Sequence, residues 1–305
     1  MYRREFRFTG LVLMALAASA GVAQDRGVVH TPDVDIGYEA FGIAGKATPV
    51  IAVNGGPGLT HRYMLVNDVW QQIARRRLVV FYDQRGTGAS RRLRPNAPQT
   101  MDAQVSDLEA VRAALNLEKV ALVGDSYGGM LAMAYAAAHT EHVARLVLSD
   151  SAAPSWNGLV HQLPQTFPDI EAEDEAEQKQ LGDGTDAAAQ ASLRNHFRMI
   201  FYSPARRDAY LARMGNLGFE PAVAGKVEKA TADLDLTSQL AGFTTFPTLV
   251  ITGRYDMNVA PLTAWRIAHQ IPGARIVFFE RSGHLPAYEE PIRYRKVLEA
   301  FLEGR

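Results

Sequence analysis

Short apolar runs recur along the chain and are separated by stretches with helical periodicity. Residues 35–41 alternate between apolar and polar positions, and residues 49–53 form the continuous apolar run of a buried strand. Similar runs occupy residues 78–82, 120–123, 146–148, 248–251 and 276–279. The clearest helical pattern follows Thr100, which is a good N-cap residue. Strands that alternate with helices predict right-handed βαβ units and a largely parallel sheet, which is an α/β fold.

Residues 151–242 interrupt this alternation, because they contain no run that resembles a buried strand. They include an acidic stretch at 171–177 and helical fragments around 193–201 and 208–214. We therefore predict a helical cap over one end of the sheet. The remaining core would consist of two segments: residues 24–150 and 243–305.

The first 23 residues have the pattern of an export signal. Arg3, Arg4 and Arg7 precede an apolar run at 11–18, and small residues follow as far as Ala23. The apolar run is short for a membrane span, so we expect cleavage rather than a stable anchor. The two adjacent arginines also match the start of a twin-arginine signal. The sequence thus predicts a periplasmic or secreted protein, and a first helix of the fold is the alternative reading.

Composition narrows the range of functions. The chain has 305 residues, 47% of them hydrophobic, and a formal net charge of −1, so no overall basic field favours nucleic-acid binding. It has no cysteine, which excludes thiolate nucleophiles and disulfides. His139 and His142 lie three residues apart without a set of carboxylates around them. We predict no metal and no cofactor; the oligomeric state is left open.

The sequence Gly-Asp-Ser-Tyr-Gly at 124–128 matches the G-x-S-x-G motif. It follows the apolar run at 120–123 and opens an alanine-rich helical stretch at 130–138. A tight strand-to-helix turn of this kind exposes the hydroxyl of its central serine. Ser126 is therefore the predicted nucleophile. Asp125 is the alternative considered, but it lies one position before the centre of the motif.

A serine hydroxyl needs a base, and the base needs an acid that orients it. Asp256 lies just beyond the apolar run at 248–251, and His284 follows the run at 276–279 in a short glycine-containing loop. Both positions are at carboxyl ends of predicted parallel strands, where such sheets collect their functional groups. We predict a triad of Ser126, Asp256 and His284.

The anion that forms during acyl transfer requires N–H donors that are already in place. One is predicted from Tyr127, directly after the nucleophile. The other is expected from the glycine-rich loop at 54–58. A phosphate-binding loop is the rival reading of this segment, but the Lys-Ser/Thr ending is missing and Pro57 has no N–H.

Together these motifs resemble the prolyl aminopeptidases (proline iminopeptidases) of the α/β-hydrolase fold. The resemblance rests on Gly-Gly-Pro-Gly at 55–58 with His61 and Tyr63, on Asp-Gln-Arg-Gly-Thr-Gly-Ala-Ser at 83–90 and on the 124–128 motif. It continues through residues 253–256, 283–284 and 289–291, so it runs from about residue 30 to the C-terminus in family order. It implies that Gly56 is the second oxyanion donor and that residues 83–90 shape the loop beside the site.

The sequence also departs from the pattern of this family. The family usually has His at the position of Asn54, and acidic groups of its cap bind the free amino group of the substrate. The acidic residues of this cap that we consider as substrate-binding are Glu171, Glu173, Glu175 and Glu220. No local motif aligns any of them with the family, and a solvated helix face is the alternative.

Three functions remain open at this stage. The first is hydrolysis of an amide bond next to a free N-terminus, in short peptides or amino-acid amides. The second is hydrolysis of a carboxylic ester or lactone with the same triad, because fold and triad do not determine the substrate. The third is a non-catalytic binding protein, which the intact triad disfavours.

Overall fold

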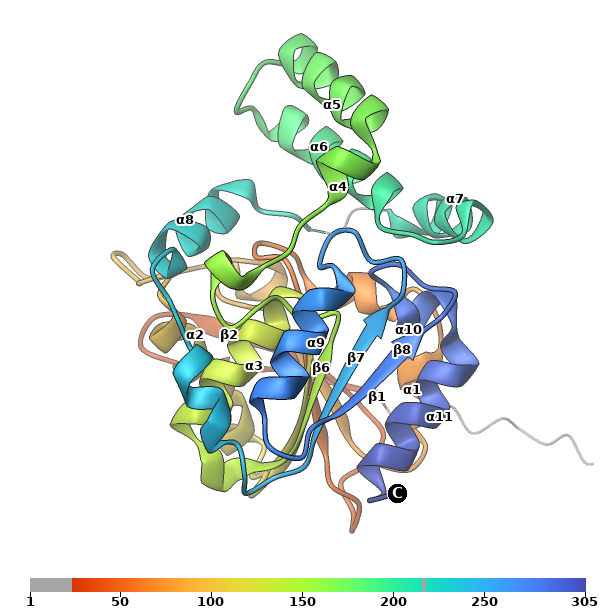
Figure 1. Ribbon diagram of the computed structural model, residues 1–305. Coiled ribbons are helices and arrows are strands. Elements are labelled where there is room, and N and C mark those ends of the chain that lie inside the picture. The colour runs from red at the N-terminus through yellow and green to blue at the C-terminus, as the bar shows by residue number, and fades with distance from the viewer. Residues whose placement is uncertain (1–23, 216–217) are drawn as a thin grey trace, which may run out of the picture.

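The computed structural model describes residues 24–215 and 218–305, so the predicted export signal at 1–23 lies outside the described residues. An eight-stranded sheet forms the centre, in the order β1-β2-β4-β3-β5-β6-β7-β8 (Figure 1). The strands are β1 (Gln24–His30), β2 (Asp35–Phe41), β3 (Val50–Val53), β4 (Val79–Tyr82), β5 (Val120–Asp125), β6 (Val143–Ser149), β7 (Thr248–Gly253) and β8 (Arg275–Phe279). β1 and β2 are antiparallel to their neighbours, and the other pairs are parallel. The predicted largely parallel sheet is confirmed.

Helices cover both faces of the sheet. The helices of the core are α1 (Val69–Ala74), α2 (Met101–Ala114), α3 (Tyr127–Ala138), α9 (Pro261–Gln270), α10 (Pro286–Glu289) and α11 (Pro291–Leu302). Ile51 and Val53 of β3 belong to a cluster with α2, α3 and α9, whereas Val50 and Ala52 pack with α1 and α11. All four residues of β3 are fully buried because alternate side chains enter two different cores.

β1 is the strand that the hydrophobic pattern did not indicate. It pairs with β2 from Gln24↔Phe41 to His30↔Asp35, at the edge of the sheet. Val29 is its only buried residue. Since an edge strand with one buried side chain is held mainly by backbone hydrogen bonds, its sequence carries little periodic signal.

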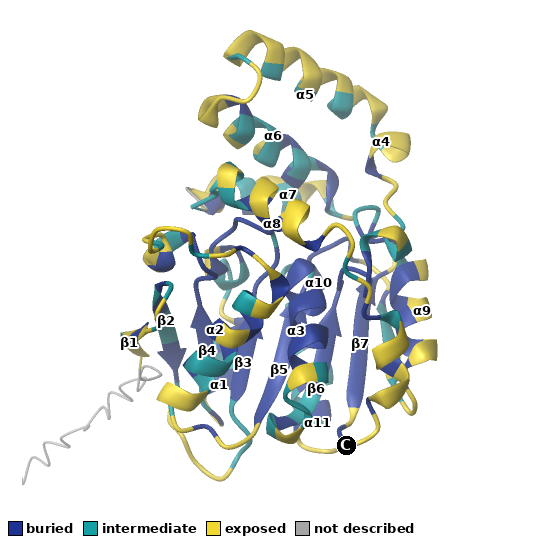
Figure 2. Cartoon of the chain, turned by 90° about the vertical axis from the view of Figure 1, so that its left-hand side faces the viewer, coloured by how far each residue is buried: buried dark blue, intermediate teal, exposed yellow. Residues whose placement is uncertain are grey.

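Between β6 and β7 the described residues form a cap of helices above the carboxyl ends of the strands (Figure 1). Its helices are α4 (Leu163–Thr166), α5 (Pro168–Leu181), α6 (Asp186–Met199), α7 (Pro204–Met214) and α8 (Pro221–Thr231). Figure 2 shows that the outer cap is largely exposed while the sheet beneath it is buried. Phe197, Ile200 and Tyr210 of the cap pack in one cluster with Leu59 and Leu285 of the core loops. This cluster fixes the cap over the end of the sheet.

Short 3-10 helices connect several of these elements: η1 (His61–Leu65), η2 (Gly88–Ser90), η3 (Thr140–His142), η4 (Trp156–Gly158) and η5 (Thr237–Gly242). Within residues 24–215 and 218–305, no helix is both long and apolar enough to cross a membrane.

Candidate active site

Ser126 occupies a strained turn between β5 and α3. Its φ of 54° lies in the left-handed region that non-glycine residues rarely adopt. The flanking glycines are required by close packing, because a Cβ on Gly124 would lie 2.4 Å from the Gly128 carbonyl oxygen, and one on Gly128 would lie 2.2 Å from the Val53 carbonyl oxygen. This is the geometry of a nucleophile elbow, with the serine at the entrance to a helix.

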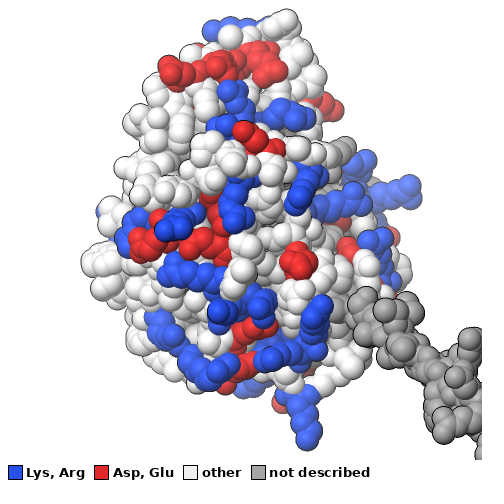
Figure 3. Space-filling model, turned by 90° about the vertical axis from the view of Figure 1, so that its right-hand side faces the viewer, with Lys and Arg blue, Asp and Glu red and all other residues white. Residues whose placement is uncertain are grey.

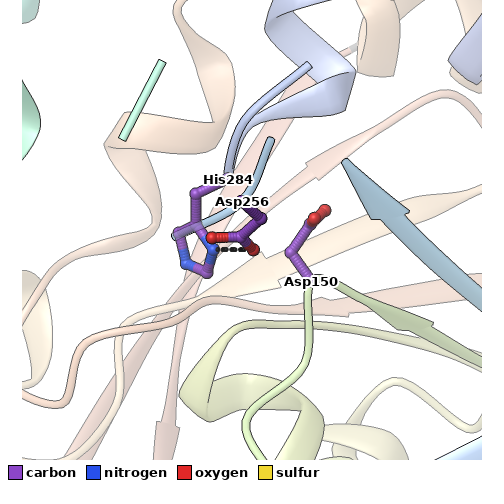
Figure 4. Close-up of side chains that lie close together, drawn as sticks. All are labelled: Asp150, Asp256 and His284. Atoms are coloured by element: carbon purple, nitrogen blue, oxygen red, sulfur yellow. Dashed lines mark hydrogen bonds and ion pairs between the residues drawn. The ribbon is translucent and has the colours of Figure 1, made fainter. Parts of the chain in front are cut away.

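Asp256 and His284 form a buried hydrogen-bonded pair (Figure 4). The Asp256 carboxylate lies 2.7 Å from Nδ1 of His284, and Asp256 is fully buried. Its other oxygen accepts the backbone N–H groups of Asn258 and Val259, both at 2.9 Å. These bonds fix the carboxylate, so that Nδ1 carries the proton and Nε2 is free to act as the base.

Glu289 links the loop that contains His284, the predicted base, to the cap. Its carboxylate accepts the N–H of Gly283 at 2.6 Å, and it also accepts the N–H groups of Tyr202 and Ser203. In addition, the His284 N–H donates to the carbonyl oxygen of Ile200 at 2.8 Å. The position of the base is therefore coupled to the cap segment that joins α6 to α7.

The charge on His284 depends on two opposing effects. Burial of the ring opposes protonation, but the charge and the hydrogen bond of Asp256 outweigh it, so the pKa of His284 is raised above its ordinary value. The charge of Asp125 also raises the pKa of His284.

The raised pKa of His284 predicts how activity decreases at low pH. The base must be neutral to accept a proton, so kcat/KM is expected to fall on acidification through a single ionisation above about 6.5, the ordinary histidine value. Initial rates between pH 5 and 9 on a neutral substrate measure this limb. A rate that stays flat down to pH 5 would contradict the assignment of His284 as the base.

The two predicted oxyanion donors, Gly56 and Tyr127, line the same cavity as Ser126. Tyr127 is the first residue of α3, so its N–H has no carbonyl partner within the helix. Asn54 anchors the loop that carries Gly56, because its side-chain amide donates to the carbonyl oxygens of Gly55 and Leu59 at 2.8 and 2.9 Å. The side chain of Asn54 thus has a defined structural role here.

Asp125 takes part in a chain of hydrogen bonds beside the nucleophile. The Gly55 N–H donates to the Tyr63 hydroxyl at 2.6 Å, and this hydroxyl donates to the Asp125 carboxylate at 2.5 Å. Burial raises the pKa of Asp125 to about 6. These hydrogen bonds link the oxyanion loop to the elbow. Asp125 therefore has a structural role beside the nucleophile, and Ser126 occupies the tip of the turn.

His61 anchors the segment that follows the oxyanion loop. Its Nδ1 lies 2.8 Å from Asp83 and its Nε2 lies 3.2 Å from Glu39. Burial opposes protonation, but these hydrogen bonds raise the pKa of His61 to about 8. The ring is therefore an imidazolium at neutral pH, and its contribution to stability is lost as the pH rises through 8.

A cavity of about 530 Å³ lies between the elbow and the cap. Ser126 and His284 line its floor, and residues of the cap line the opposite wall. Most of its lining is apolar, with the side chains of Leu59, Trp156, Leu159, Leu193, Phe197, Ile200, Phe219 and Val259. Among the described residues that line it, none is lysine or arginine. The cavity therefore suits a small substrate that is neutral or positively charged.

The structure does not bring the four predicted cap glutamates to this cavity. Glu173 and Glu175 are exposed on α5, where Glu173 pairs with Arg198, and Glu171 is half-buried on the same helix. Figure 3 shows acidic side chains gathered on the outer face of the cap, at the top of the view. Glu220 precedes α8 and forms an ion pair with Arg91 at 2.6 Å. Glu173 and Glu175 thus lie on a solvated helix face, which was the alternative interpretation, whereas Asp174 and Glu177 of the same run accept hydrogen bonds from Asn195 of α6.

Glu228 of α8 is the cap carboxylate that does line the cavity. Glu228 is a solvent-exposed residue without an ion-pair partner among the described residues, and partial burial of its carboxyl group raises its pKa. Pro221 and Ala224 line the cavity from the same helix face, at helical spacing from Glu228. A helical projection of residues 221–231 would have shown one carboxylate on a face of small residues, and this signal was missed.

Comparison with known proteins agrees with this geometry. The family described as the alpha/beta hydrolase fold matches residues 48–291. The proline iminopeptidase of Lactobacillus delbrueckii subsp. lactis is 31% identical over 278 residues, which cover 85% of this chain and 92% of the relative. The chain belongs to the proline iminopeptidase-like family of α/β-hydrolases.

Relatives in sequence and neighbours in structure of this proline iminopeptidase-like hydrolase have names that describe different activities. The proline iminopeptidase of Saccharolobus solfataricus is 29% identical and covers 88% of the chain and 89% of its own length. The solved structure of an esterase, RhEst1 from Rhodococcus sp. ECU1013, aligns with a TM-score of 0.73 at 22% identity, covering 93% of this chain and 98% of that one. The second likeness shows the fold alone, so the substrate of this hydrolase is a separate question.

Proposed function

We propose that this protein is a serine aminopeptidase that releases an N-terminal residue, proline or another, from short peptides or amino-acid amides. The observation that carries the proposal is Glu228, a solvent-exposed residue of α8 that lines the cavity containing Ser126 and has no ion-pair partner among the described residues. An ammonium group that leaves water for such a cavity needs a carboxylate as its partner. The absence of lysine and arginine from the described lining favours the same substrate.

The chemistry follows from the positions of the triad. Ser126 Oγ attacks the carbonyl carbon while Nε2 of His284 takes its proton, and Asp256 stabilises the imidazolium that forms. The N–H groups of Gly56 and Tyr127 stabilise the oxyanion. His284 then protonates the leaving amine, and a water molecule, activated by the same base, hydrolyses the acyl-enzyme.

A second candidate is hydrolysis of carboxylic esters or lactones. It is supported by the apolar lining, because side chains such as Trp156, Leu159 and Phe219 suit an uncharged acyl chain. Both candidates use the same nucleophile, base and oxyanion donors, so the triad does not distinguish them.

A substrate panel tests the proposal. Aminoacyl-p-nitroanilides with a free amine, including proline, are compared with short-chain p-nitrophenyl esters on the protein without residues 1–23. We expect the free-amine anilides to be hydrolysed and to give the highest kcat/KM among the amides. Hydrolysis of the esters with no turnover of any anilide would favour the esterase.

A further inference from the structure

One face of α6 lines the cavity that contains Ser126. Its lining residues are three or four positions apart, and the last of them directly follows the helix: Ala189, Ser192, Leu193, His196, Phe197 and Ile200. This spacing places them on one side of the helix. His196 is the ionisable side chain of this face, and the mechanism described above leaves it without a role.

The contact between α6 and the core places His196 on the side of the base. Ile200, about one helical turn beyond His196, accepts the N–H of His284 at 2.8 Å. The charge of His284 also lowers the pKa of His196. Since His284 gives its proton to the leaving amine, the leaving group departs on this side of the cavity.

Glu228, the proposed partner of the substrate's amine, belongs to a helix with a different attachment. Thr231 of the same helix accepts the Nε1–H of Trp156 at 3.0 Å, and the Trp156 ring stacks on that of Tyr127. Helix α8 is thus linked to the residue that follows the nucleophile, whereas α6 is linked to the base. The acyl residue and the leaving group are therefore covered by different helices of the cap.

His196 is a neutral imidazole with free hydrogen-bonding groups. Burial lowers the pKa of His196 to about 4; the charges of His284 and His161 act in the same direction, and that of Asp174 opposes them. In the part of the chain that the structure describes, neither ring nitrogen has a hydrogen-bond partner. A neutral imidazole has one N–H donor and one acceptor nitrogen. His196 therefore offers an uncharged donor to a group in the cavity.

We propose that His196 is a specificity-determining residue for the leaving group: its ring N–H donates to the first carbonyl oxygen of the peptide that leaves. The inference rests on the proposed function, because that function makes the leaving group a peptide. A carboxylate in this place is disfavoured, since no lysine or arginine is among the described residues of the lining. The preferred leaving group is an uncharged peptide unit, as in a longer peptide or a dipeptide amide.

Two leaving groups of nearly the same shape test this hydrogen bond. Glycinamide has a carbonyl oxygen and an amide nitrogen where isobutylamine has two methyl groups. Each is joined to the best acyl residue of the substrate panel, and kcat/KM is measured for the unmodified enzyme, His196→Leu and His196→Gln. Leucine removes the polar atoms at similar size, and glutamine retains an N–H donor. The control is His161→Leu, because His161 is an exposed histidine of the cap that does not line the cavity.

We expect His196→Leu to lower kcat/KM for the glycinamide substrate about five- to tenfold, as is typical of a lost neutral hydrogen bond, and to change the isobutylamide rate less than about twofold. His196→Gln should recover most of this difference, and His161→Leu should leave both rates unchanged. In the unmodified enzyme the ratio of the two rates should be constant between about pH 6 and 9, because His196 stays neutral over this range. A structural role for His196 would change both rates by the same factor.

Equal losses with the two substrates in His196→Leu would overturn the proposal, and so would unchanged rates with both. If His196→Leu does not fold, His196→Ala provides the same comparison. Turnover of esters without turnover of any amide would instead show that the proposed function is wrong. The esters of glycolamide and isobutanol with one acyl group would then form the matched pair that tests the hydrogen bond from His196.

Discussion

Replacement of Ser126 by alanine is expected to lower kcat at least about a thousandfold. The reason is that Ser126 occupies the strained turn at φ 54° between β5 and α3, whereas the hydroxyl of the adjacent Tyr127 accepts a hydrogen bond from Gln104. Removal of Oγ leaves the glycine contacts of the elbow intact, so the fold should be unchanged. Turnover of the best substrate, together with circular dichroism and thermal unfolding, measures both effects.

Ser151 provides a matched control for this variant. It lies near the elbow and is buried, but its hydroxyl donates to the Ala152 carbonyl oxygen. Ser151→Ala should keep most of the activity, and a fluorophosphonate should label the unmodified enzyme and Ser151→Ala but not Ser126→Ala. Near-normal turnover by Ser126→Ala would show that the nucleophile is a different residue.

Acetylation of the substrate's amino group is the second change with a large expected effect. It removes the positive charge that Glu228 is proposed to bind and leaves the carbonyl chemistry nearly the same. We expect a loss of more than about a hundredfold in kcat/KM, which corresponds to about 3 kcal/mol of transition-state binding. The matched pair is a free and an N-acetylated aminoacyl-p-nitroanilide of the same residue.

Glu228→Gln should produce a loss of about 10- to 100-fold with the free-amine substrate and little change with the acetylated one. Glu220→Gln is the control, because Glu220 belongs to the same part of the cap but pairs with Arg91 and does not line the cavity. Equal rates on free and acetylated substrates would refute amine binding and would favour the esterase with an unchanged triad. Loss of activity in Glu220→Gln alone would place the amine elsewhere in the cap.

Features that depend on neighbouring residues were predictable from the sequence. The elbow is an example, since its strand, its two glycines and its helix are all contained in residues 120–138. Thr100 is another: it caps α2 and accepts the Ala103 N–H, as the local pattern indicates. Asp256 and His284 were identified because each follows a short apolar strand, and the carboxyl ends of parallel strands meet at one edge.

Features that depend on contacts between distant segments were decided by the tertiary structure. The acidic run made Glu171, Glu173 and Glu175 candidates, but the orientation of α5 exposes Glu173 and Glu175 to solvent and leaves Glu171 half-buried outside the cavity. Composition cannot indicate which face of a cap helix covers the cavity, because that choice depends on packing against Leu59 and Leu285 of the core.

Asp150 shows the same distinction most clearly. In the sequence it is one aspartate after an apolar strand, 106 positions before the acid of the triad. Only the parallel pairing of β6 with β7 brings it to within 4.8 Å of Asp256 and His284. Local pattern determined the strands and the residues at their ends, whereas strand order and cap orientation determined which of those residues share a low-dielectric site and alter one another's charge.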